Sequence, residues 1–407
     1  MKSPNAGRCR GNRAGNRPAS AHRIRRKITV MSQWYNQKSG ALAELKALTK
    51  RQTQAADYPR AGYIQNNVPV YDGSGLADCD RKALMGEWAD VLLNGPGIIA
   101  IKHAFPDTAP IDRATAVFET IIAAEKAAGA SAADHFAKPG ANDRIWNVLE
   151  KHCLADPEGF ASYFANPAIA TVAEAWLGPA YQMTAQMNRV NPGGTAQSAH
   201  RDYHLGFMTA TQSARYPAHV HALSPALTLQ GAVAHCDMPL ESGPTLYLPF
   251  SQHMEAGYLA FPRPEFQEFF QKNHMQLPLE KGDAVFFNPA LMHAAGTNTS
   301  KDIYRMANLL QVSSAFGRAM ETVNRTAMCL ALYPTLLASD MDIGARTAVI
   351  AAAAEGYAFP TNLDRDPPID GLAPASQADL MHKALQERTS AEAFHDEMTA
   401  LSTRRTS

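Results

Sequence analysis

The sequence lacks the cysteine patterns that stabilise small secreted folds or bind structural zinc. Its 407 residues contain five cysteines, an odd number at wide spacing, and none forms a CxxC pair. A disulfide framework and a zinc site are therefore not expected, and reduced thiols in the cytoplasm are the plain interpretation. The longest apolar stretches, such as residues 348–354, are far shorter than the roughly 20 residues of a membrane-spanning helix, so no membrane association is expected.

The sequence also has no excess of charge of one sign, but the balance hides an asymmetry. Lysine plus arginine equals aspartate plus glutamate, at 38 each. Residues 1–30 hold nine of the basic residues and no acidic one, which leaves a formal charge of −9 on the rest. An acidic body disfavours nucleic-acid binding, which needs clustered lysine and arginine. Residues 1–30 are expected to be a disordered leader, either an organelle transit peptide or the product of a start assigned upstream of Met31.

The pattern of apolar residues changes twice along the chain. Helical spacing dominates before residue 181 and returns after 315, and the middle alternates like strands between turn residues. We expect a mainly β core with α flanks, made of one catalytic domain over residues 31–330, with its β core at about 181–315, and a helical extension over 331–407. The expected helices are 41–50, 80–93, 112–128, 142–153 and 167–177, and the expected strands are 98–105, 181–190, 226–238, 245–249, 276–279, 284–288 and 305–313.

An H-x-D pair, His200 and Asp202, lies in the densest polar cluster of the chain. On a strand, residues two apart point to the same face, so the imidazole and the carboxylate can converge on one point. With one more imidazole they would form the 2-His-1-carboxylate triad, which leaves three positions of an octahedral Fe(II) open. The alternative for an isolated H-x-D pair is an ordinary surface position.

His293 and Arg305 are the candidates that would complete such a site. His293 ends an apolar, β-rich run, where a core histidine bonded to a backbone carbonyl is the alternative. Arg305 begins a largely apolar predicted strand twelve residues later. A buried guanidinium needs a partner, and its planar fork suits a carboxylate. That partner is either the distal carboxylate of 2-oxoglutarate or a protein Asp or Glu.

Five other residues are weaker candidates. Gln186 and Asn188 alternate on a predicted strand and could hydrogen-bond 2-oxoglutarate or substrate, or face solvent as ordinary polar residues. Gln197 precedes His200 by three residues and could approach the same co-substrate. Tyr203 and His204 follow the pair and could line the substrate pocket, and His204 could instead orient a metal ligand.

Together these motifs resemble the phytanoyl-CoA dioxygenase family over about residues 85–315. The resemblance rests on the order and spacing of five segments: His-Arg-Asp at 200–202, Glu-Ser-Gly-Pro-Thr-Leu-Tyr-Leu-Pro-Phe-Ser-Gln-His at 241–253, Gly-Asp at 282–283, His-Ala-Ala-Gly-Thr-Asn-Thr-Ser at 293–300 and Arg305. It implies a double-stranded β-helix (a jelly roll), with His200, Asp202 and His293 holding Fe(II) and Arg305 holding 2-oxoglutarate.

The resemblance also implies an activity. The enzyme would be a dioxygenase that uses O₂ and 2-oxoglutarate to hydroxylate a C–H bond, with release of succinate and CO₂. Asp202 disfavours halogenation, because related halogenases have a small residue in place of the carboxylate. Ala295 is a departure, since several relatives have a hydroxyl residue there that contacts the co-substrate.

Two other functions remain open from the sequence. The chain could be a catalytically silent, ligand-binding member of the same fold, or a cupin-type metal oxygenase that does not use 2-oxoglutarate. Retention of all four key residues disfavours the first, and Arg305 disfavours the second. The expected partner is a small-molecule substrate, with a polar metabolite or natural-product intermediate favoured over an acyl-CoA. The helices after residue 315 are compatible with a lid or a homodimer contact.

Overall fold

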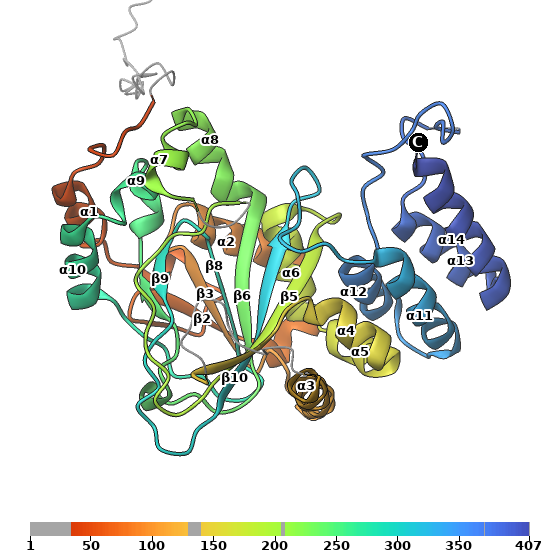
Figure 1. Cartoon of the computed structure of the whole chain (residues 1–407), viewed down its shortest axis with the longest axis horizontal. Helices are drawn as coiled ribbons and strands as arrows, with labels where there is room; N and C mark the ends of the chain where they lie inside the picture. Colours follow the sequence, from red (N-terminus) through yellow and green to blue (C-terminus); the bar gives the residue numbers. More distant parts are fainter. Residues whose placement is uncertain (1–33, 129–139, 205–207, 370, 407) are drawn as a thin grey trace, which may run out of the picture.

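The computed structural model describes residues 34–128, 140–204, 208–369 and 371–406. A large mixed sheet forms its centre, and helices lie around the sheet and at both ends (Figure 1). This arrangement confirms the predicted combination of a β core with helical flanks. The leader predicted for residues 1–30 lies outside the described residues.

The main sheet has eight strands, and a separate ladder has two. In the main sheet the order is β1-β2-β3-β8-β6-β10-β5-β4, with β2 and β3 parallel and the other neighbours antiparallel. The smaller ladder pairs β7 with β9. The strands are β1 (Tyr63–Gln65), β2 (Val68–Asp72), β3 (Ile98–Lys102), β4 (Asn142–Ile145), β5 (Gln182–Val190), β6 (Thr228–Ala234), β7 (Leu246–Leu248), β8 (Ala284–Phe287), β9 (Met292–Ala294) and β10 (Arg305–Ser313).

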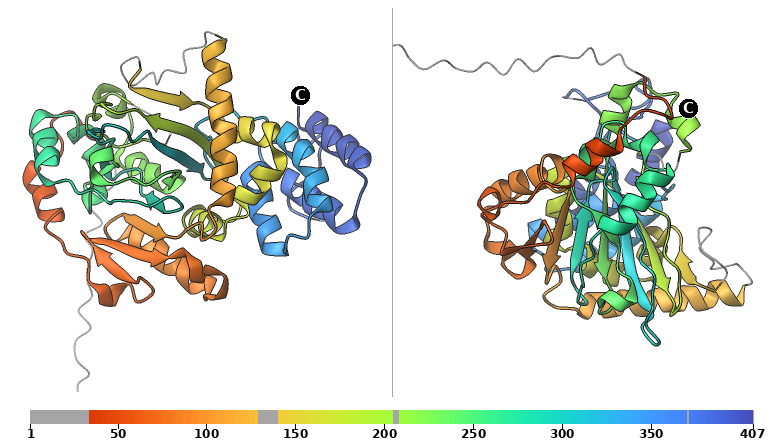
Figure 2. Two further views of the ribbon diagram at one scale, coloured as in Figure 1. Left: turned by 90° about the horizontal axis from the view of Figure 1, so that it is seen from below. Right: turned by 90° about the vertical axis from the view of Figure 1, so that its left-hand side faces the viewer.

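The helices fall into groups along the molecule. Figures 1 and 2 show α11 to α14 gathered at one end and α1 with α10 at the opposite end. The α-helices are α1 (Leu42–Leu48), α2 (Arg81–Leu93), α3 (Ala109–Ala127), α4 (Val148–Ala155), α5 (Pro157–Phe164), α6 (Pro167–Leu177), α7 (Ala210–Ser213), α8 (Ala218–Leu223), α9 (Gly257–Ala260), α10 (Pro264–Asn273), α11 (Arg325–Ala338), α12 (Ile343–Ala353), α13 (Gln377–Glu387) and α14 (Ala391–Arg405).

The two faces of the main sheet have different partners, as the period of two along a strand requires. Alternate residues such as Ile99, Leu310 and Phe286 join the large hydrophobic core that the helices α2 to α6 and α11 to α14 share. Their neighbours point to the other face. Near β3 and β8 that face is apolar and packs against Tyr247 of β7, whereas on β5, β6 and β10 it borders a cavity. The cavity-facing residues of these strands are thus free to carry polar groups.

The β7–β9 ladder is the centre of a second, smaller layer. Isolated bridges extend it on both sides, because His200 pairs with His293 of β9 and Met275 pairs with Tyr247 of β7. The cavity lies between this layer and the main sheet, since residues of both line it.

Most predicted elements are confirmed, and two segments differ. Strand β10 and helix α6 have the predicted bounds, and the other predicted helices and strands shift by a few residues. Residues 142–153 were predicted as one helix, which is wrong in its first half: 142–145 form the edge strand β4, because they pair with β5. Residues 276–279 form only an isolated bridge at Leu279. Strands β1, β2 and β9 were not predicted.

The Gly-Asp step at 282–283 ties two strands of the main sheet together. Gly282 has a φ of +96°, and a Cβ on it would lie 2.9 Å from the carbonyl oxygen of Phe105. Asp283 is buried and accepts hydrogen bonds from Lys102 Nζ (2.6 Å) and from the backbone N–H groups of His103 (2.9 Å) and Glu280 (2.7 Å). The carboxylate therefore fixes the end of β3 against the start of β8.

Replacing Asp283 should destabilise the fold. Asp283→Ala leaves a half-buried ammonium and two backbone donors without their acceptor, so the free energy of unfolding should fall by about 2–4 kcal/mol. Urea denaturation measures the loss. Asp112→Ala is the control, because Asp112 pairs with Lys281 at an exposed position and should change stability by less than about 1 kcal/mol. Equal effects of the two variants would contradict this role of Asp283.

Candidate metal and co-substrate site

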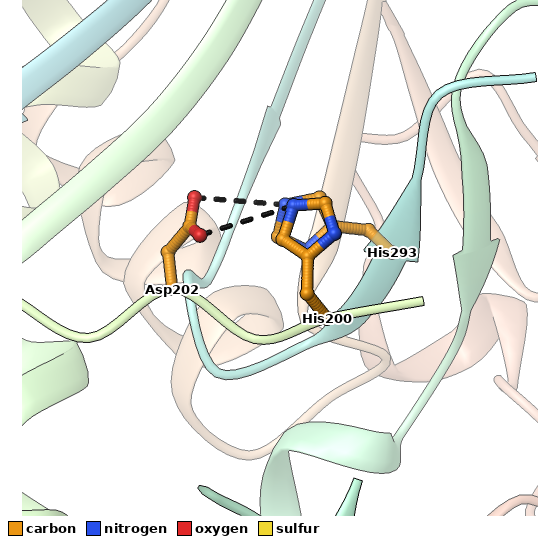
Figure 3. A group of neighbouring side chains, drawn as sticks. All are labelled: His200, Asp202 and His293. Atoms are coloured by element: carbon orange, nitrogen blue, oxygen red, sulfur yellow. Dashed lines mark ion pairs between the residues drawn. The ribbon is translucent and has the colours of Figure 1, made fainter. Parts of the chain in front are cut away.

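Three potential metal ligands meet at one edge of the cavity. His200, Asp202 and His293 each offer a donor atom, and these atoms lie within 4.8 Å of one another. Figure 3 shows both imidazole rings turned towards the Asp202 carboxylate. The His200 Nε2 atom is 3.8 Å from Oδ1, and the His293 Nε2 atom is 3.7 Å from Oδ2. The structure thus brings together the three residues predicted as the facial triad.

Backbone carbonyls fix the orientation of both imidazoles. The Nδ1 atom of His200 lies 3.0 Å from the carbonyl oxygen of Ser198, and that of His293 lies 2.8 Å from the carbonyl oxygen of Leu291. A carbonyl only accepts hydrogen bonds, so each Nδ1 carries a proton, and in the neutral ring the lone pair is then on Nε2. A metal needs this tautomer, and the second hydrogen bond of each ring supports it.

The carboxylate is buried and only partly satisfied by protein. Asp202 is 6% exposed. Gln230 Nε2 donates a hydrogen bond to its Oδ2 atom, whereas Oδ1 has no hydrogen-bond partner among the described residues. Burial raises the pKa of Asp202, but the contacts with His293 and His200 and the Gln230 hydrogen bond together hold it below its usual value. Burial, and next the neighbouring His293, lower the pKa of His200. An ionised carboxylate beside a neutral imidazole suits a divalent cation.

A buried turn joins the two segments that carry these ligands. Arg201, between His200 and Asp202, donates from its guanidinium to the backbone carbonyls of Ser251 and Met254. The Ser251 hydroxyl in turn accepts a hydrogen bond from the backbone N–H of Met292, the residue before His293, at 2.8 Å. Ser251 is completely buried. This gives the Pro-Phe-Ser-Gln-His motif at 249–253 a physical role, because it holds both ligand segments at once.

Arg305 lies at the same cavity with part of its guanidinium unused. It is 7% exposed, and its Nη1 atom has no hydrogen-bond partner among the described residues. Burial lowers the pKa of Arg305 to about 10, and Cys236 and Tyr247 act against that shift. No carboxylate of the described chain lies within ion-pair distance of it. The predicted alternative of a protein Asp or Glu partner therefore finds no support in the described part of the chain.

Tyr247 connects Arg305 with the ligand group. It lines the cavity together with Arg305, and it is the cross-strand partner of His293 in the β7–β9 ladder. A ligand that reaches from His293 past Tyr247 would therefore present its far end to the guanidinium. The cavity has a volume of about 980 Å³, which suits a small co-substrate together with a small substrate.

The weaker candidates divide into two groups. Gln186, Asn188 and Gln197 line the cavity. Tyr203 and His204 do not belong to its lining: Tyr203 packs in a small core with Tyr258, and the Nδ1 atom of His204 lies 2.7 Å from the Thr228 hydroxyl. Their role towards a substrate stays a prediction.

Several polar residues of the site were not predicted from the sequence. Gln230 stands alone in the apolar strand β6, and this isolation was a usable signal for a buried polar contact. Arg144 and Glu321 also line the cavity, but they come from an edge strand and a loop that no motif marks. Ala295, predicted as a departure from related sequences, lies in the lining as well.

Two imidazoles and a carboxylate on one side of a cavity, with a buried guanidinium nearby, are typical of 2-oxoglutarate-dependent non-haem iron enzymes. Residues 93–307 match the sequence profile described as phytanoyl-CoA dioxygenase (PhyH). The chain belongs to the phytanoyl-CoA dioxygenase family, whose enzymes use Fe(II), 2-oxoglutarate and O₂. No protein of curated function matches the chain.

Solved structures resemble the chain at low sequence identity. The non-haem α-ketoglutarate-dependent epimerase SnoN from nogalamycin biosynthesis is 19% identical, with a TM-score of 0.40, and the match covers 57% of this chain and 82% of SnoN. The carbocyclase SnoK from the same biosynthesis is 18% identical, with a TM-score of 0.39, and the match covers 59% of this chain and 86% of SnoK. Separately, none of the described helices is both long and apolar enough to cross a membrane.

Loss of either imidazole should remove the metal. His200→Ala or His293→Ala should abolish turnover and lower the Fe(II) content after dialysis, while the circular dichroism spectrum stays unchanged, because neither ring supports the main core. Metal analysis of the purified variants measures this. The control is His395→Ala, which removes an exposed histidine of α14. Retention of stoichiometric iron by both site variants would contradict the assignment of these ligands.

The turn at Ser251 should matter for metal affinity rather than only for stability. Ser251→Ala removes the hydroxyl that accepts from Met292, so the position of His293 should relax and Fe(II) affinity should fall about 10- to 100-fold. Metal titration with a competing chelator measures it. Ser242→Ala is the matched control, since Ser242 is equally buried and its hydroxyl donates only to the nearby Pro239 carbonyl. An equal loss of metal affinity in both variants would refute a specific role of Ser251.

Proposed function

We propose that the protein is an Fe(II)- and 2-oxoglutarate-dependent dioxygenase that hydroxylates a C–H bond of a small-molecule substrate and releases succinate and CO₂. The observation that carries this proposal is the Nη1 atom of Arg305, which has no hydrogen-bond partner among the described residues, in the cavity whose edge holds His200, Asp202 and His293. A buried cation without a protein anion is costly, so a bound carboxylate is its natural partner.

Each part of the site has a separate task in this proposal. His200, Asp202 and His293 would hold the iron, which would supply the binding site for O₂ and for the keto acid end of 2-oxoglutarate. Arg305 holds the distal carboxylate of 2-oxoglutarate and so directs its keto acid end towards the ligands. Gln230 keeps the Asp202 carboxylate oriented. When bound, iron with 2-oxoglutarate and O₂ supplies an oxidant able to attack an unactivated C–H bond.

The protein residues also control what enters the site. Gln186, Asn188 and Gln197 face the cavity, where they could hydrogen-bond the co-substrate or the substrate. We assign the face-to-face arrangement of the main sheet and the β7–β9 layer to a double-stranded β-helix. The carboxylate of Asp202 fills the position that a halogenase leaves open for chloride, which favours hydroxylation over halogenation.

The two alternative functions are less compatible with these residues. A silent binding protein would have no need for two imidazoles with their Nδ1 atoms bonded to carbonyls and their Nε2 atoms turned towards one carboxylate. A cupin-type oxygenase without 2-oxoglutarate would have no use for a buried guanidinium at Arg305 whose Nη1 atom has no partner in the described part of the chain.

Removing the Arg305 side chain should weaken co-substrate binding and leave the metal in place. Arg305→Ala loses two charge-assisted hydrogen bonds, so 2-oxoglutarate binding should weaken by roughly 2–5 kcal/mol. Arg305→Lys keeps the charge without the fork and should be intermediate. The measurement is the affinity for 2-oxoglutarate under anaerobic conditions, beside the iron content, which should not change.

One measured outcome would overturn this proposal. If Arg305→Ala binds 2-oxoglutarate as tightly as the unmodified protein, Arg305 does not anchor the co-substrate. Succinate formation in a screen of metabolites with Fe(II) and ascorbate then tests the activity itself. Complete independence of turnover from 2-oxoglutarate would favour the cupin-type alternative.

A further inference from the structure

One wall of the cavity carries two charged groups, Arg144 and Glu321, to which the proposed reaction gives no task. Arg144 of β4, Gln186 of β5 and Glu321 of the loop after β10 all line it. The Arg144 Nη1 atom donates to Gln186 Oε1 at 2.9 Å, and the guanidinium lies 5.0 Å from the centre of the Trp146 ring. These contacts make a built polar surface rather than a set of loose side chains.

The strand register separates this wall from the co-substrate anchor. Gln230, which holds Asp202, pairs with Gln311 of β10, and Leu309 on the same face pairs with Gln186 of β5. The Gln186 group therefore lies across the strands from the metal ligands. Arg305 lies six residues from Gln311 along β10. The Gln186 group and Arg305 thus lie in different directions from the metal ligands. A co-substrate at Arg305 and a substrate beside Gln186 can therefore bind at the same time.

Glu321 is the member of this wall with an unused atom. Its Oε1 atom accepts a hydrogen bond from the backbone N–H of Asn147 at 2.7 Å. Its Oε2 atom is buried and has no hydrogen-bond partner among the described residues. Burial raises the pKa of Glu321, although the Asn147 N–H, the Gln186 side chain and the positive charges of Lys151 and Arg144 act against the shift. The loop thus fixes one carboxylate oxygen and leaves the other for a ligand in the cavity.

The surroundings of Glu321 restrict what that ligand can be. Leu309 and Met320 are apolar and also line the cavity, and both lie next to Gln186, since Leu309 is its cross-strand partner and the Met320 sulfur is 3.6 Å from its Nε2 atom. When ionised, the Glu321 carboxylate accepts hydrogen bonds and carries negative charge beside the Arg144 guanidinium, which lines the same wall. A ligand that matches both features has an N–H donor with positive charge on an apolar body.

We propose, building on the function proposed above, that Glu321 binds the amino group of the prime substrate. The substrate is then a small primary or secondary amine whose apolar body lies against Leu309 and Met320. Its ammonium group pairs with Glu321 Oε2, which replaces the water that both charges lose on burial. Glu321 thus determines the specificity for an amine substrate and takes no part in the oxidation.

The experiment uses matched compounds, because only the class of the substrate is specified. The full chain is loaded anaerobically with Fe(II) and 2-oxoglutarate and equilibrated with an equimolar mixture of hexyl, benzyl and indolylethyl compounds. Each body is present as an amine, an alcohol and a carboxylic acid. Mass spectrometry of the retained fraction should show the amines enriched over the other two. Glu321→Gln should lower amine binding by about 10- to 100-fold, as expected for one charge-assisted hydrogen bond.

Glu150→Gln is the matched control. Glu150 Oε2 accepts from the Asn147 side chain (3.0 Å) and from the backbone N–H of Asn324 (2.8 Å). It therefore supports the same loop without lining the cavity, and its variant should keep the preference for amines. Preferential retention of alcohols or acids, no enrichment of amines, or an equal loss in both variants would overturn the proposal.

The same preparations separate this proposal from the proposed function. Their affinity for 2-oxoglutarate should be unchanged in Glu321→Gln, because Arg305 is untouched. If the unmodified chain binds 2-oxoglutarate but shows no preference for amines, only the role of Glu321 fails. If it binds no 2-oxoglutarate, the proposed function fails, whichever compounds are retained.

Discussion

The backbone pairing of His200 with His293 is the constraint on which the rest of the site depends. The N–H of each residue donates to the carbonyl of the other, at 2.9 and 3.0 Å. This bridge brings two segments far apart in the sequence into one register, and Asp202 follows two residues later on the same side. Ser251 then holds both segments, since its carbonyl accepts a hydrogen bond from Arg201 and its hydroxyl accepts one from the backbone N–H of Met292. Each hydrogen bond is modest alone, but together they fix ligand atoms before any metal is present.

The site keeps charged atoms that the protein itself leaves unsatisfied. Asp202 Oδ1, Arg305 Nη1 and Glu321 Oε2 are buried without hydrogen-bond partners in the described chain. Each lowers the stability of the free protein, because a desolvated polar group without a partner is unfavourable. A metal or ligand that supplies the missing contact stabilises the fold by the binding free energy it gains. The large helix-side core of the main sheet offsets this local cost.

The helices, strands and site residues that a local sequence pattern marks could be predicted from the sequence. Strand β10 and helix α6 have strong periodicity, and the H-x-D pair with His293 and Arg305 has recognisable spacing. Strand β4 was missed because its strand character comes from pairing with β5, which no local pattern encodes. The isolation of Gln230 in an apolar strand signalled a buried polar contact, but its partner, like the surroundings of Glu321, depends on which residues lie nearby in the fold. The cavity lining also leaves out Tyr203 and His204, since their position beside the ligands in sequence does not determine where their side chains point.

The main sheet explains how one cavity can serve two small molecules. Its cavity-facing residues lead away from the metal ligands in two directions, along strand β10 and across to strand β5. Along β10 they end at Arg305, a cation, and across β10 and β5 they lead to Gln186 and Glu321, an anion. An ammonium at Arg305 would face like charge, whereas on the other wall the Glu321 carboxylate stands beside the Arg144 guanidinium. If both proposals hold, the positive charge of Arg305 would exclude an ammonium substrate from the co-substrate position, so the cavity would distinguish the two molecules by charge as well as by shape.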